Sequence, residues 1–332
     1  MPHVSVIVPC LNEEATIGAL LEAIHTQSYP RAELEVIIAD GLSEDATRQR
    51  IAEFQAAHPD LALRVIDNPN RVIPAGLNLA IHAARGEVIL RLDAHSVPAS
   101  DYVQNSLAAL EAGRGWNVGG VWQIQAQQPD WVAQSIAAAA AHPFGVGDAF
   151  YRFTTQAQVV DTVPFGAFRK SLIDQIGPFD ESLLANEDYE FNARIRQAGG
   201  TVWLDPTIRS VYFARSNLYA LARQYARYGF WKYRMLRRYP QTLRWRQALP
   251  PLFVAAFLLL PLLHLLWPPL IWLWLAQVVS YALLLLAAGF LQAVRARKPL
   301  LVIGLPLAII TMHFSWGSAF LWSKLSTARK AG

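Results

Sequence analysis

Apolar segments of two different periodicities follow one another along the first 100 residues of this 332-residue chain. Runs of aliphatic and β-branched residues, which predict buried strands, lie at 4–8, 34–39, 63–66 and 88–92. Stretches with apolar residues every three or four positions, which predict helices, lie between them at 17–24, 46–57 and 74–84. Strands that alternate with helices predict an α/β fold with a mixed, mostly parallel sheet covered on both faces.

The last third of the chain has a different pattern, because three long apolar blocks follow one another there. The blocks span 248–267, 269–290 and 300–322 and contain no acid, lysine or arginine. Each has about the 20 residues that a helix needs to cross roughly 30 Å of hydrocarbon. A single block is also compatible with a buried core helix, but three in succession predict a chain that is integrated in a membrane.

The cations around these blocks predict their orientation. Arginines precede the first block and cations separate the second from the third, whereas the link at 267–269 carries no charge. By the positive-inside rule, the first two blocks form a hairpin with both outer ends in the cytoplasm. A third crossing would place Lys324, Arg329 and Lys330 outside, against that rule. Either this tail is an exception, or the third block re-enters the membrane without crossing it.

Charge is divided unequally between the two halves of the chain. Residues 1–205 hold 25 acids and 13 lysines and arginines, whereas residues 206–332 hold 16 lysines and arginines and no acid. A basic half suits either nucleic acid or an anionic membrane surface. The apolar blocks in the same half favour membrane lipids as the partner and exclude nucleic acid from the prediction.

A basic segment leads into the first apolar block. Within 217–240, four arginines spaced four, seven and four residues apart share one helical face, and aromatic residues lie on the opposite face. We expect an amphipathic helix in the headgroup plane, or alternatively a helix packed on the soluble domain. The predicted organisation is a domain at 1–215, an interfacial helix region at 216–247 and a membrane region with two or three transmembrane helices at 248–324.

Cysteine content and the first residues predict the compartment. Cys10 is the single cysteine, which excludes an internal disulfide and suits a reducing compartment. The first residues show no basic leader followed by a long apolar region. We therefore expect a multi-pass protein of the inner (plasma) membrane whose 1–215 domain is cytoplasmic.

Polar side chains follow three of the predicted strands. Pro9–Glu13, Asp40 and Asp93–His95 come where strands end, and ligands of such sheets bind beyond those ends. In an extended chain, Asp93 and His95 point to the same side, and a carboxylate with an imidazole suits a divalent metal. A solvated loop after the strand is the alternative. The glycine patterns of dinucleotide-binding and P-loop sites are absent from the sequence, so this crevice needs another ligand.

Three segments in a fixed order resemble the nucleotide-sugar half of family 2 glycosyltransferases with the GT-A fold: VSVIVPCLNEEATI, LEVIIADGLSEDAT and EVILRLDAHS. Two further segments, GAFRKSLIDQIGPFDESL and NEDYEFNARIRQAGG, resemble the acceptor half of that family. Almost the whole chain, including DNPNRVIPAGLNLAI, HPFGVGDAFYR and the apolar tail, is similar to membrane-bound glucosyltransferases of succinoglycan-type exopolysaccharide synthesis. The resemblance implies a GT-A nucleotide-sugar-binding domain that transfers a sugar.

The resemblance implies a nucleotide site at the ends of the first two strands. Asp40 would meet the nucleotide base, and a carboxylate there accepts the imide N–H of uracil, which favours a UDP-sugar donor. Pro9, Asn12 and Glu13 would lie beside the base and ribose, although Asn12 or Glu13 could instead cap the following helix. Arg71 is a weaker candidate for the nucleotide, and a solvated surface position is its alternative.

The resemblance also implies a metal site. Asp93 and His95 occupy the first and third positions of the family's Asp-x-Asp motif, which holds the metal that bridges the two donor phosphates. Histidine suits Mn²⁺ better than Mg²⁺, which prefers oxygen ligands. The implied cofactor is therefore Mn²⁺ or Mg²⁺.

Glu187 and Asp188 resemble the acidic pair of the family's acceptor half, in which the aspartate is the general base. Asp188 would take the proton of an acceptor hydroxyl, and a single displacement would invert the anomeric carbon. The alternative is that Asp188 is a helix-start charge stabilised by the helix dipole and that Glu187 is a solvated helix residue.

Processive members of the family carry a Gln-x-x-Arg-Trp motif that holds the acceptor and the nucleotide diphosphate. Gln241–Trp245 matches every specified position of that motif. The second candidate, Gln224 with Arg227, differs from the motif at its last position but lies at the more usual distance from Glu187. We favour Gln224 and Arg227, and the departure argues against a processive synthase. Arg215 is a candidate for a lipid diphosphate, because a guanidinium suits phosphate oxygens.

These implications predict an inverting glycosyltransferase that moves a hexose, expected to be glucose from UDP-glucose, onto a polyprenyl-diphosphate-linked saccharide in exopolysaccharide synthesis. One alternative is a polyprenyl-phosphate sugar synthase, in which the lipid phosphate itself is the acceptor. The alternative of another class is a membrane-anchored nucleotide-sugar-binding protein without turnover.

Overall fold

The computed structural model describes residues 3–328, so Arg329 and Lys330 of the predicted orientation lie outside the described residues. The chain forms two compact units. Unit 1 comprises Met1–Gln123 and Phe150–Tyr212, and unit 2 comprises Ile124–Ala149 and Phe213–Gly332. Residues 124–149, which lie inside the predicted 1–215 domain, therefore cluster with the C-terminal helices.

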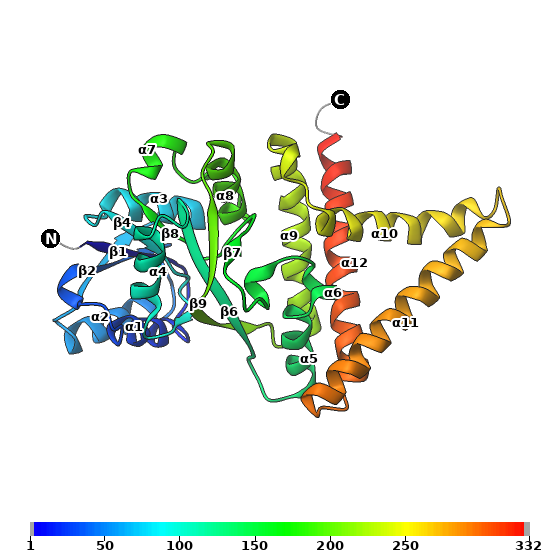
Figure 1. Cartoon of the computed structure of the whole chain (residues 1–332), viewed down its shortest axis with the longest axis horizontal. Coiled ribbons are helices and arrows are strands. Elements are labelled where there is room, and N and C mark those ends of the chain that lie inside the picture. Colours follow the sequence, from blue (N-terminus) through cyan, green and yellow to red (C-terminus); the bar gives the residue numbers. More distant parts are fainter. Residues whose placement is uncertain (1–2, 329–332) are drawn as a thin grey trace. The chain divides into compact units, whose positions relative to one another are not determined.

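A mixed sheet forms the centre of unit 1 (Figure 1). In the order of their pairing, its strands are β3 (Ala62–Asp67), β2 (Leu34–Asp40), β1 (Val4–Cys10), β4 (Val88–Arg91), β8 (Ala167–Arg169), β6 (Asn117–Ala126), β9 (Val202–Ala214) and β5 (Val97–Pro98), and β7 (Gln158–Val159) also pairs with β9. The strands β1–β4 are parallel, whereas β8 is antiparallel to β4 and β6. The four strands predicted at the start of the chain are thus confirmed.

Helices cover both faces of this sheet. One core contains residues of α1 (Ile17–His25), α2 (Thr47–Ala57) and α4 (Tyr102–Glu111), and the other contains residues of α3 (Ile73–Ala83), α7 (Leu172–Ile176) and α8 (Glu187–Gln197). Val6 belongs to the first core and Ile7 to the second, because successive side chains of a strand point to opposite faces. Short 3₁₀ turns lie at Arg31–Glu33 (η1) and Phe150–Arg152 (η2).

Strand register brings the predicted site to one edge of the sheet. Cys10 at the end of β1 pairs with Asp40 at the end of β2, and Asp40 pairs with Asp67 at the end of β3. In β4, Arg91 lies opposite Ile7, so the segment after Arg91 leaves the sheet toward the same edge. The expectation that the strand ends form one edge with polar side chains is therefore confirmed.

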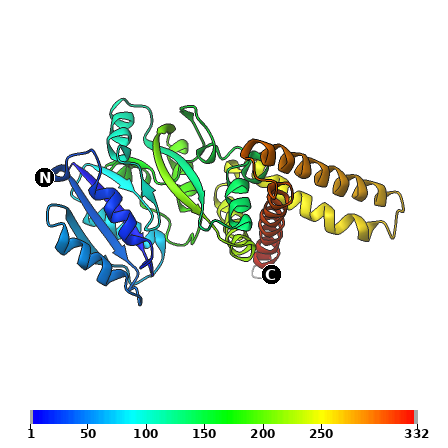
Figure 2. The same ribbon diagram turned by 90° about the horizontal axis from the view of Figure 1, so that it is seen from below.

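Unit 2 is helical. Its helices are α5 (Trp131–Ala140), α6 (Pro143–Val146), α9 (Leu218–Arg238), α10 (Trp245–Leu263), α11 (Leu270–Ala296) and α12 (Leu301–Ala328), with a 3₁₀ turn η3 at Pro240–Thr242. In the described chain, α10, α11 and α12 are long and apolar enough to cross a membrane, as the three blocks predict. Helix α12 continues through Pro306 without a break. Figure 2 shows α10 and α11 side by side, projecting together away from the other helices of unit 2.

Candidate active site

A buried arginine at the end of β4 connects the acidic residues of the predicted site. The side chain of Arg91 is 3% exposed. Its Nη2 atom donates to Oδ1 of Asp93 and to Oε1 of Glu187, each over 3.0 Å. Its Nη1 atom donates to Oδ1 of Asp188, which lies 97 positions later in the chain. One guanidinium therefore brings the strand end and the start of α8 together.

Three carboxylates around one guanidinium leave an excess of negative charge in a poorly solvated place. Burial raises the pKa of the Asp188 carboxyl to about 7, and repulsion from Glu187 and Asp93 adds to this against the attraction of Arg91. A carboxylate that binds a proton near neutral pH is suited to general base catalysis. Asp188 therefore combines a raised pKa, which suits a general base, with a position on the same guanidinium as Asp93.

The start of α8 is not solvated surface. Glu187 is 9% exposed, and Glu190 is fully buried and accepts hydrogen bonds from Arg194 over 2.6 and 2.9 Å. The alternative that Glu187 is a solvated helix residue is therefore wrong. Asn186 precedes the helix with a φ of 67°, in the left-handed region that asparagine tolerates. The N–H groups of the first turn favour the negative charge of Asp188.

Asp93 and His95 lie on a turn, not in extended chain. The backbone N–H and the hydroxyl of Ser96 both donate to the carbonyl oxygen of Asp93, over 2.9 and 2.7 Å. The premise that Asp93 and His95 share one side of a strand is therefore wrong. Both residues still follow the carboxyl end of β4, and the Nδ1 atom of His95 lies 3.2 Å from Oε1 of Glu13.

The pair of His95 and Glu13 has an arrangement typical of metal-binding histidines. When Nδ1–H of the imidazole donates to a carboxylate, Nε2 keeps its lone pair and becomes the ligand atom. Asp93 adds a carboxylate with a second oxygen, Oδ2, besides the one that Arg91 contacts. One imidazole nitrogen and one carboxylate oxygen fit a divalent ion such as Mn²⁺. The donor set therefore fits the implied cofactor.

Asp40 is fully buried at the end of β2. Its Oδ1 accepts from the hydroxyl of Ser43 over 2.5 Å, and its Oδ2 accepts from the Ser43 N–H over 3.0 Å and from Nε of Arg48 over 2.5 Å. Arg48 also contacts Asp67 at the end of β3 over 2.5 Å. Both oxygens of the predicted base-binding carboxylate thus accept hydrogen bonds from protein groups, and because Asp40 is fully buried, a nucleotide base that reaches it must displace a protein group.

Asn12 and Arg71 meet at the loop after β2. Oδ1 of Asn12 accepts from the N–H of Glu44 over 2.9 Å, and Nη1 of Arg71 donates to Oε1 of Glu44 over 2.9 Å. Thr16 precedes α1 as its N-cap residue, so the alternative that Asn12 caps this helix is wrong. Pro9 lies within β1 itself, one residue before the strand ends. Asn12 and Arg71 therefore both contact the loop that follows Asp40.

The remaining predicted residues belong to unit 2. Arg215 follows β9, and Gln224 and Arg227 lie on α9, where Nε2 of Gln224 donates to the hydroxyl of Tyr228 over 3.0 Å. In the competing motif, Gln241 lies in η3 and Arg244 precedes α10. Contacts of these residues with acceptor or diphosphate remain predictions.

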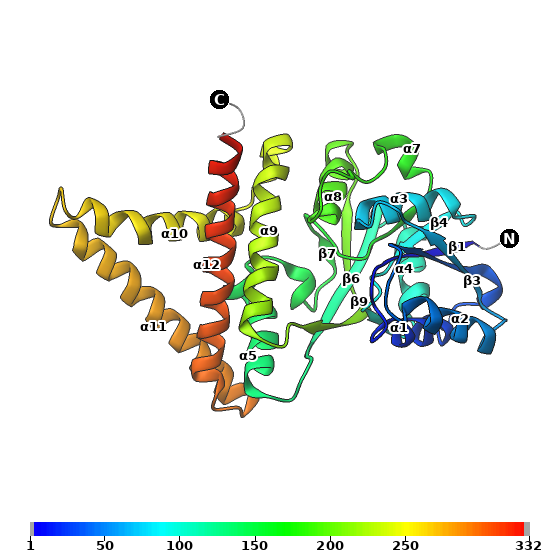
Figure 3. The same ribbon diagram turned by 180° about the vertical axis from the view of Figure 1, so that it is seen from behind.

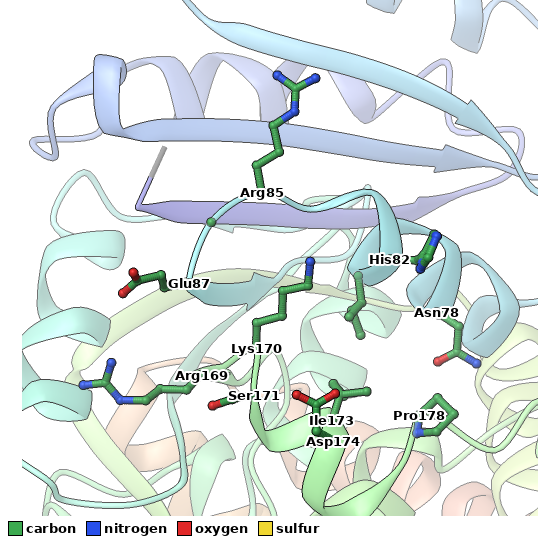
Figure 4. A pocket seen from close by; sticks show the side chains of 12 residues that line it. Asn78, His82, Arg85, Glu87, Arg169, Lys170, Ser171, Ile173, Asp174 and Pro178 are labelled. Carbon is green, nitrogen blue, oxygen red and sulfur yellow. The ribbon is translucent and has the colours of Figure 1, made fainter. Parts of the chain in front are cut away.

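A cavity of about 750 Å³ lies at the other end of β4 (Figure 4). Its lining combines the turn before β4, with Arg85 and Glu87, and the end of β8, with Arg169 and Lys170. Nζ of Lys170 donates to the carbonyl oxygen of Ala84 over 2.5 Å. Of the residues that line this cavity, none belongs to the predicted site, because that site follows the opposite, carboxyl end of β4.

Sequence reasoning missed Arg91 and Arg48. Each contacts carboxylates from two separate segments of the chain. The available signal for Arg91 was a lone cation in the aliphatic run 88–92. Arg48 had no such signal, because it lies in a helix with polar neighbours on both sides.

Comparison with known proteins gives matches over nearly the whole chain. The profile of Glycosyl transferase family 2 matches residues 5–177. The chain is 28% identical over 327 residues to the Succinoglycan biosynthesis protein ExoA of Rhizobium meliloti, covering 98% of this chain and 96% of that protein. It is 26% identical over 319 residues, covering 94% of each, to a Methanococcus voltae protein named Dolichyl N-acetyl-alpha-D-glucosaminyl phosphate 3-beta-D-2,3-diacetamido-2,3-dideoxy-beta-D-glucuronosyltransferase.

Solved structures share the fold. The mannosyltransferase PcManGT from Pyrobaculum calidifontis, in complex with GDP-Man and Mn²⁺, is similar with a TM-score of 0.62 and 23% identity, over 97% of this chain and 88% of that chain. A fragment of TarS from S. aureus, in complex with UDP, is similar with a TM-score of 0.52 and 18% identity, over 96% of this chain and 91% of that chain. The GT-A fold predicted from the sequence is confirmed.

Proposed function

This chain belongs to glycosyl transferase family 2, and on that premise we propose that it is an inverting transferase of a hexose from UDP-glucose to a lipid-linked saccharide. Glycosyl transfer itself follows from the family. The observation that carries the finer proposal is the Arg91 network, which brings Asp93 beside Glu187 and Asp188. A donor-side carboxylate and a candidate base then lie within reach of one reacting sugar.

Asp188 performs the proton transfer in this proposal. Its carboxylate accepts the proton of an acceptor hydroxyl while that oxygen attacks the anomeric carbon from the face opposite the diphosphate. One base and one displacement invert the anomeric carbon, so an α-linked donor gives a β-linked product. The Methanococcus voltae relative is named for a β-linked transfer, which supports this outcome.

Asp93 and His95 hold the metal ion in this proposal. These two side chains would hold a divalent ion, which would serve as a Lewis acid for the departing diphosphate. Glu13 fixes the orientation of the His95 imidazole, and Arg91 fixes the Asp93 carboxylate. The Mn²⁺ of the Pyrobaculum calidifontis structure supports Mn²⁺, although Mg²⁺ fits the same role.

The acceptor is a saccharide on a polyprenyl diphosphate, and the reaction takes place at the cytoplasmic face of the inner membrane in exopolysaccharide synthesis. The Methanococcus voltae relative is named for a sugar acceptor linked through phosphate to dolichol, and the Rhizobium meliloti relative for succinoglycan biosynthesis. The long apolar helices at the end of the chain keep the enzyme where such a lipid is found. Arg215, Gln224 and Arg227 are the residues that we assign to acceptor or diphosphate contacts.

We expect kcat/KM to fall as the pH drops below about 7. A protonated Asp188, with its pKa raised to about 7, cannot accept the proton of the acceptor hydroxyl, so activity needs the deprotonated form that dominates at higher pH. The donor diphosphate does not ionise in this range. A profile of kcat/KM from about pH 5.5 to about pH 8.5 measures this fall in activity at low pH. A flat profile would show that Asp188 is not the group that limits the rate.

The first test is UDP release by the detergent-purified protein from UDP-glucose and Mn²⁺, with and without a lipid extract as acceptor. We expect release that depends on the extract. His95→Ala should need more Mn²⁺ and recover part of the rate at high Mn²⁺, because one ligand is lost and Asp93 remains. UDP release with a purified polyprenyl phosphate alone would favour the sugar-phosphate synthase instead.

A further inference from the structure

Helix α12 is surrounded by other helices of unit 2, although its composition would allow it to cross a membrane. Gly304 packs against the Ser135 side chain of α5, Gly317 against the Pro250 carbonyl of α10, and Gly289 of α11 against the Val302 carbonyl. Fully or almost fully buried side chains of α12 include Leu301, Leu305, Ala308, Ile309, Met312 and Ser323. Protein contacts, not lipid, therefore cover much of this helix.

Helix α9 runs beside α12 in the same direction. A Cβ atom on Gly229 would lie 2.2 Å from the carbonyl oxygen of Trp316, and the rings of Tyr233 and Phe320 pack edge to face with centroids 5.3 Å apart. The second contact lies four residues after the first on α9 and also four residues after the first on α12, so the two helices are parallel. Figure 3 shows them side by side, as Figure 1 does from the other direction. The two helices must therefore share one depth in the membrane.

Helix α9 is unsuited to the hydrocarbon core. Its 21 residues extend about 31 Å, which equals the thickness of that core. Cations occur from its second turn to its last, at Arg223, Arg227, Lys232, Arg234, Arg237 and Arg238. Each of these cations opposes the transfer of the helix into hydrocarbon. Helix α9 therefore belongs at the membrane surface, and α12 belongs there with it.

The hairpin of α10 and α11 has the opposite character. Leucines along both helices are largely exposed, among them Leu252 at 65% on α10 and Leu283 at 61% on α11. The sequence has no acid, lysine or arginine between Arg246 and Arg295. The two helices extend about 28 and about 40 Å, enough to cross a bilayer in each direction. Trp267 at the tip of the hairpin is 63% exposed, and tryptophan favours the membrane interface.

We propose that α10 and α11 alone cross the bilayer, and that α12 lies beside α9 in the headgroup region. The cations at both ends of the hairpin and Lys324 at the end of α12 then stay on one side, in contact with anionic headgroups. This topology removes the conflict that a third crossing creates with the positive-inside rule. It also makes α12 part of the surface layer that carries α9.

Single-cysteine labelling tests the topology, because Cys10 is the one cysteine of the chain. In a Cys10→Ala background, Gln241→Cys marks the entry to α10, Pro268→Cys marks the tip and Lys324→Cys marks the end of α12. With a membrane-impermeant maleimide, Gln241→Cys and Lys324→Cys should react in sealed vesicles of one orientation and Pro268→Cys in vesicles of the other. Labelling of Lys324→Cys together with Pro268→Cys would overturn the proposal, as would labelling of Pro268→Cys together with Gln241→Cys.

Depth measurement separates a surface helix from a re-entrant one. A fluorescent probe on Leu307→Cys of α12 should be quenched by headgroup nitroxides, like a probe on Leu325→Cys, because both exposed residues would lie at the interface. The matched control is Leu284→Cys near the middle of α11, which should be quenched by nitroxides deep in the acyl chains. Deep quenching of Leu307→Cys equal to that of Leu284→Cys would overturn the proposal.

Discussion

Asp188→Asn is expected to lower the rate of sugar transfer about 10²- to 10⁴-fold, the range that a general base contributes. The amide keeps the size of the side chain and its place at the start of α8, but it cannot accept a proton. Donor binding should be almost unchanged, because the proposed metal residues Asp93 and His95 remain. Initial rates of UDP release, together with calorimetric titration of UDP and Mn²⁺, measure the two effects separately.

Asp174→Asn is the matched control for this substitution. Asp174 is an exposed aspartate on α7 that lines the cavity at the other end of β4, so its loss should leave the rate unchanged. If Asp188→Asn turns over as fast as the unaltered protein, the base is assigned wrongly. An acceptor that is already ionised, such as a lipid phosphate, would then be favoured.

Arg91→Met is expected to destabilise unit 1 by about 3–5 kcal/mol, the usual cost of removing one partner of a buried ion pair. Methionine replaces the volume of the side chain but leaves Asp93, Glu187 and Asp188 as three mutually repelling carboxylates. The deficit should shrink as the pH falls, because protonation removes that repulsion. The apparent melting temperature in detergent at several pH values measures both the loss and its pH dependence.

Arg31→Met serves as the control for that loss. Arg31 is 44% exposed and pairs with Asp60 over 2.7 Å, so its removal should cost less than about 1 kcal/mol. An equal loss in the two variants would mean that the burial of Arg91 has no special effect. A loss for Arg91→Met that does not change with pH would contradict the role of the guanidinium in holding the three carboxylates.

Local pattern was sufficient to predict the strands and helices of the sheet. The runs at 4–8 and 34–39 are aliphatic except for one polar residue each, Ser5 and Glu35, as is typical of strands buried on both faces, and the structure buries every residue of β1 and β2. The three apolar blocks likewise depend on composition alone, and they appear as α10, α11 and α12. Each of these elements could be predicted because its signal lies within its own residues.

The features that were missed depend on partners far away in the sequence. Arg91 resembles an ordinary strand-end residue until Glu187 and Asp188 are known to lie beside it. The extended conformation assumed for Asp93 and His95 ignored Ser96, whose two hydrogen bonds to Asp93 make a turn. Arg48 donates a hydrogen bond to Asp40, and periodicity cannot predict such a contact between a helix and a strand end.

The clustering of residues 124–149 with the C-terminal helices bears on how the enzyme is prepared for study. A chain cut after residue 215, the usual way to obtain a soluble fragment, would keep α5 but remove α12, against which α5 packs through Ser135 and Gly304. The face of α5 with Ile136 and several alanines would then meet water, so such a fragment is prone to aggregate. Replacing 127–148 by a short polar linker in the same fragment removes that face and offers a better starting point for crystallisation.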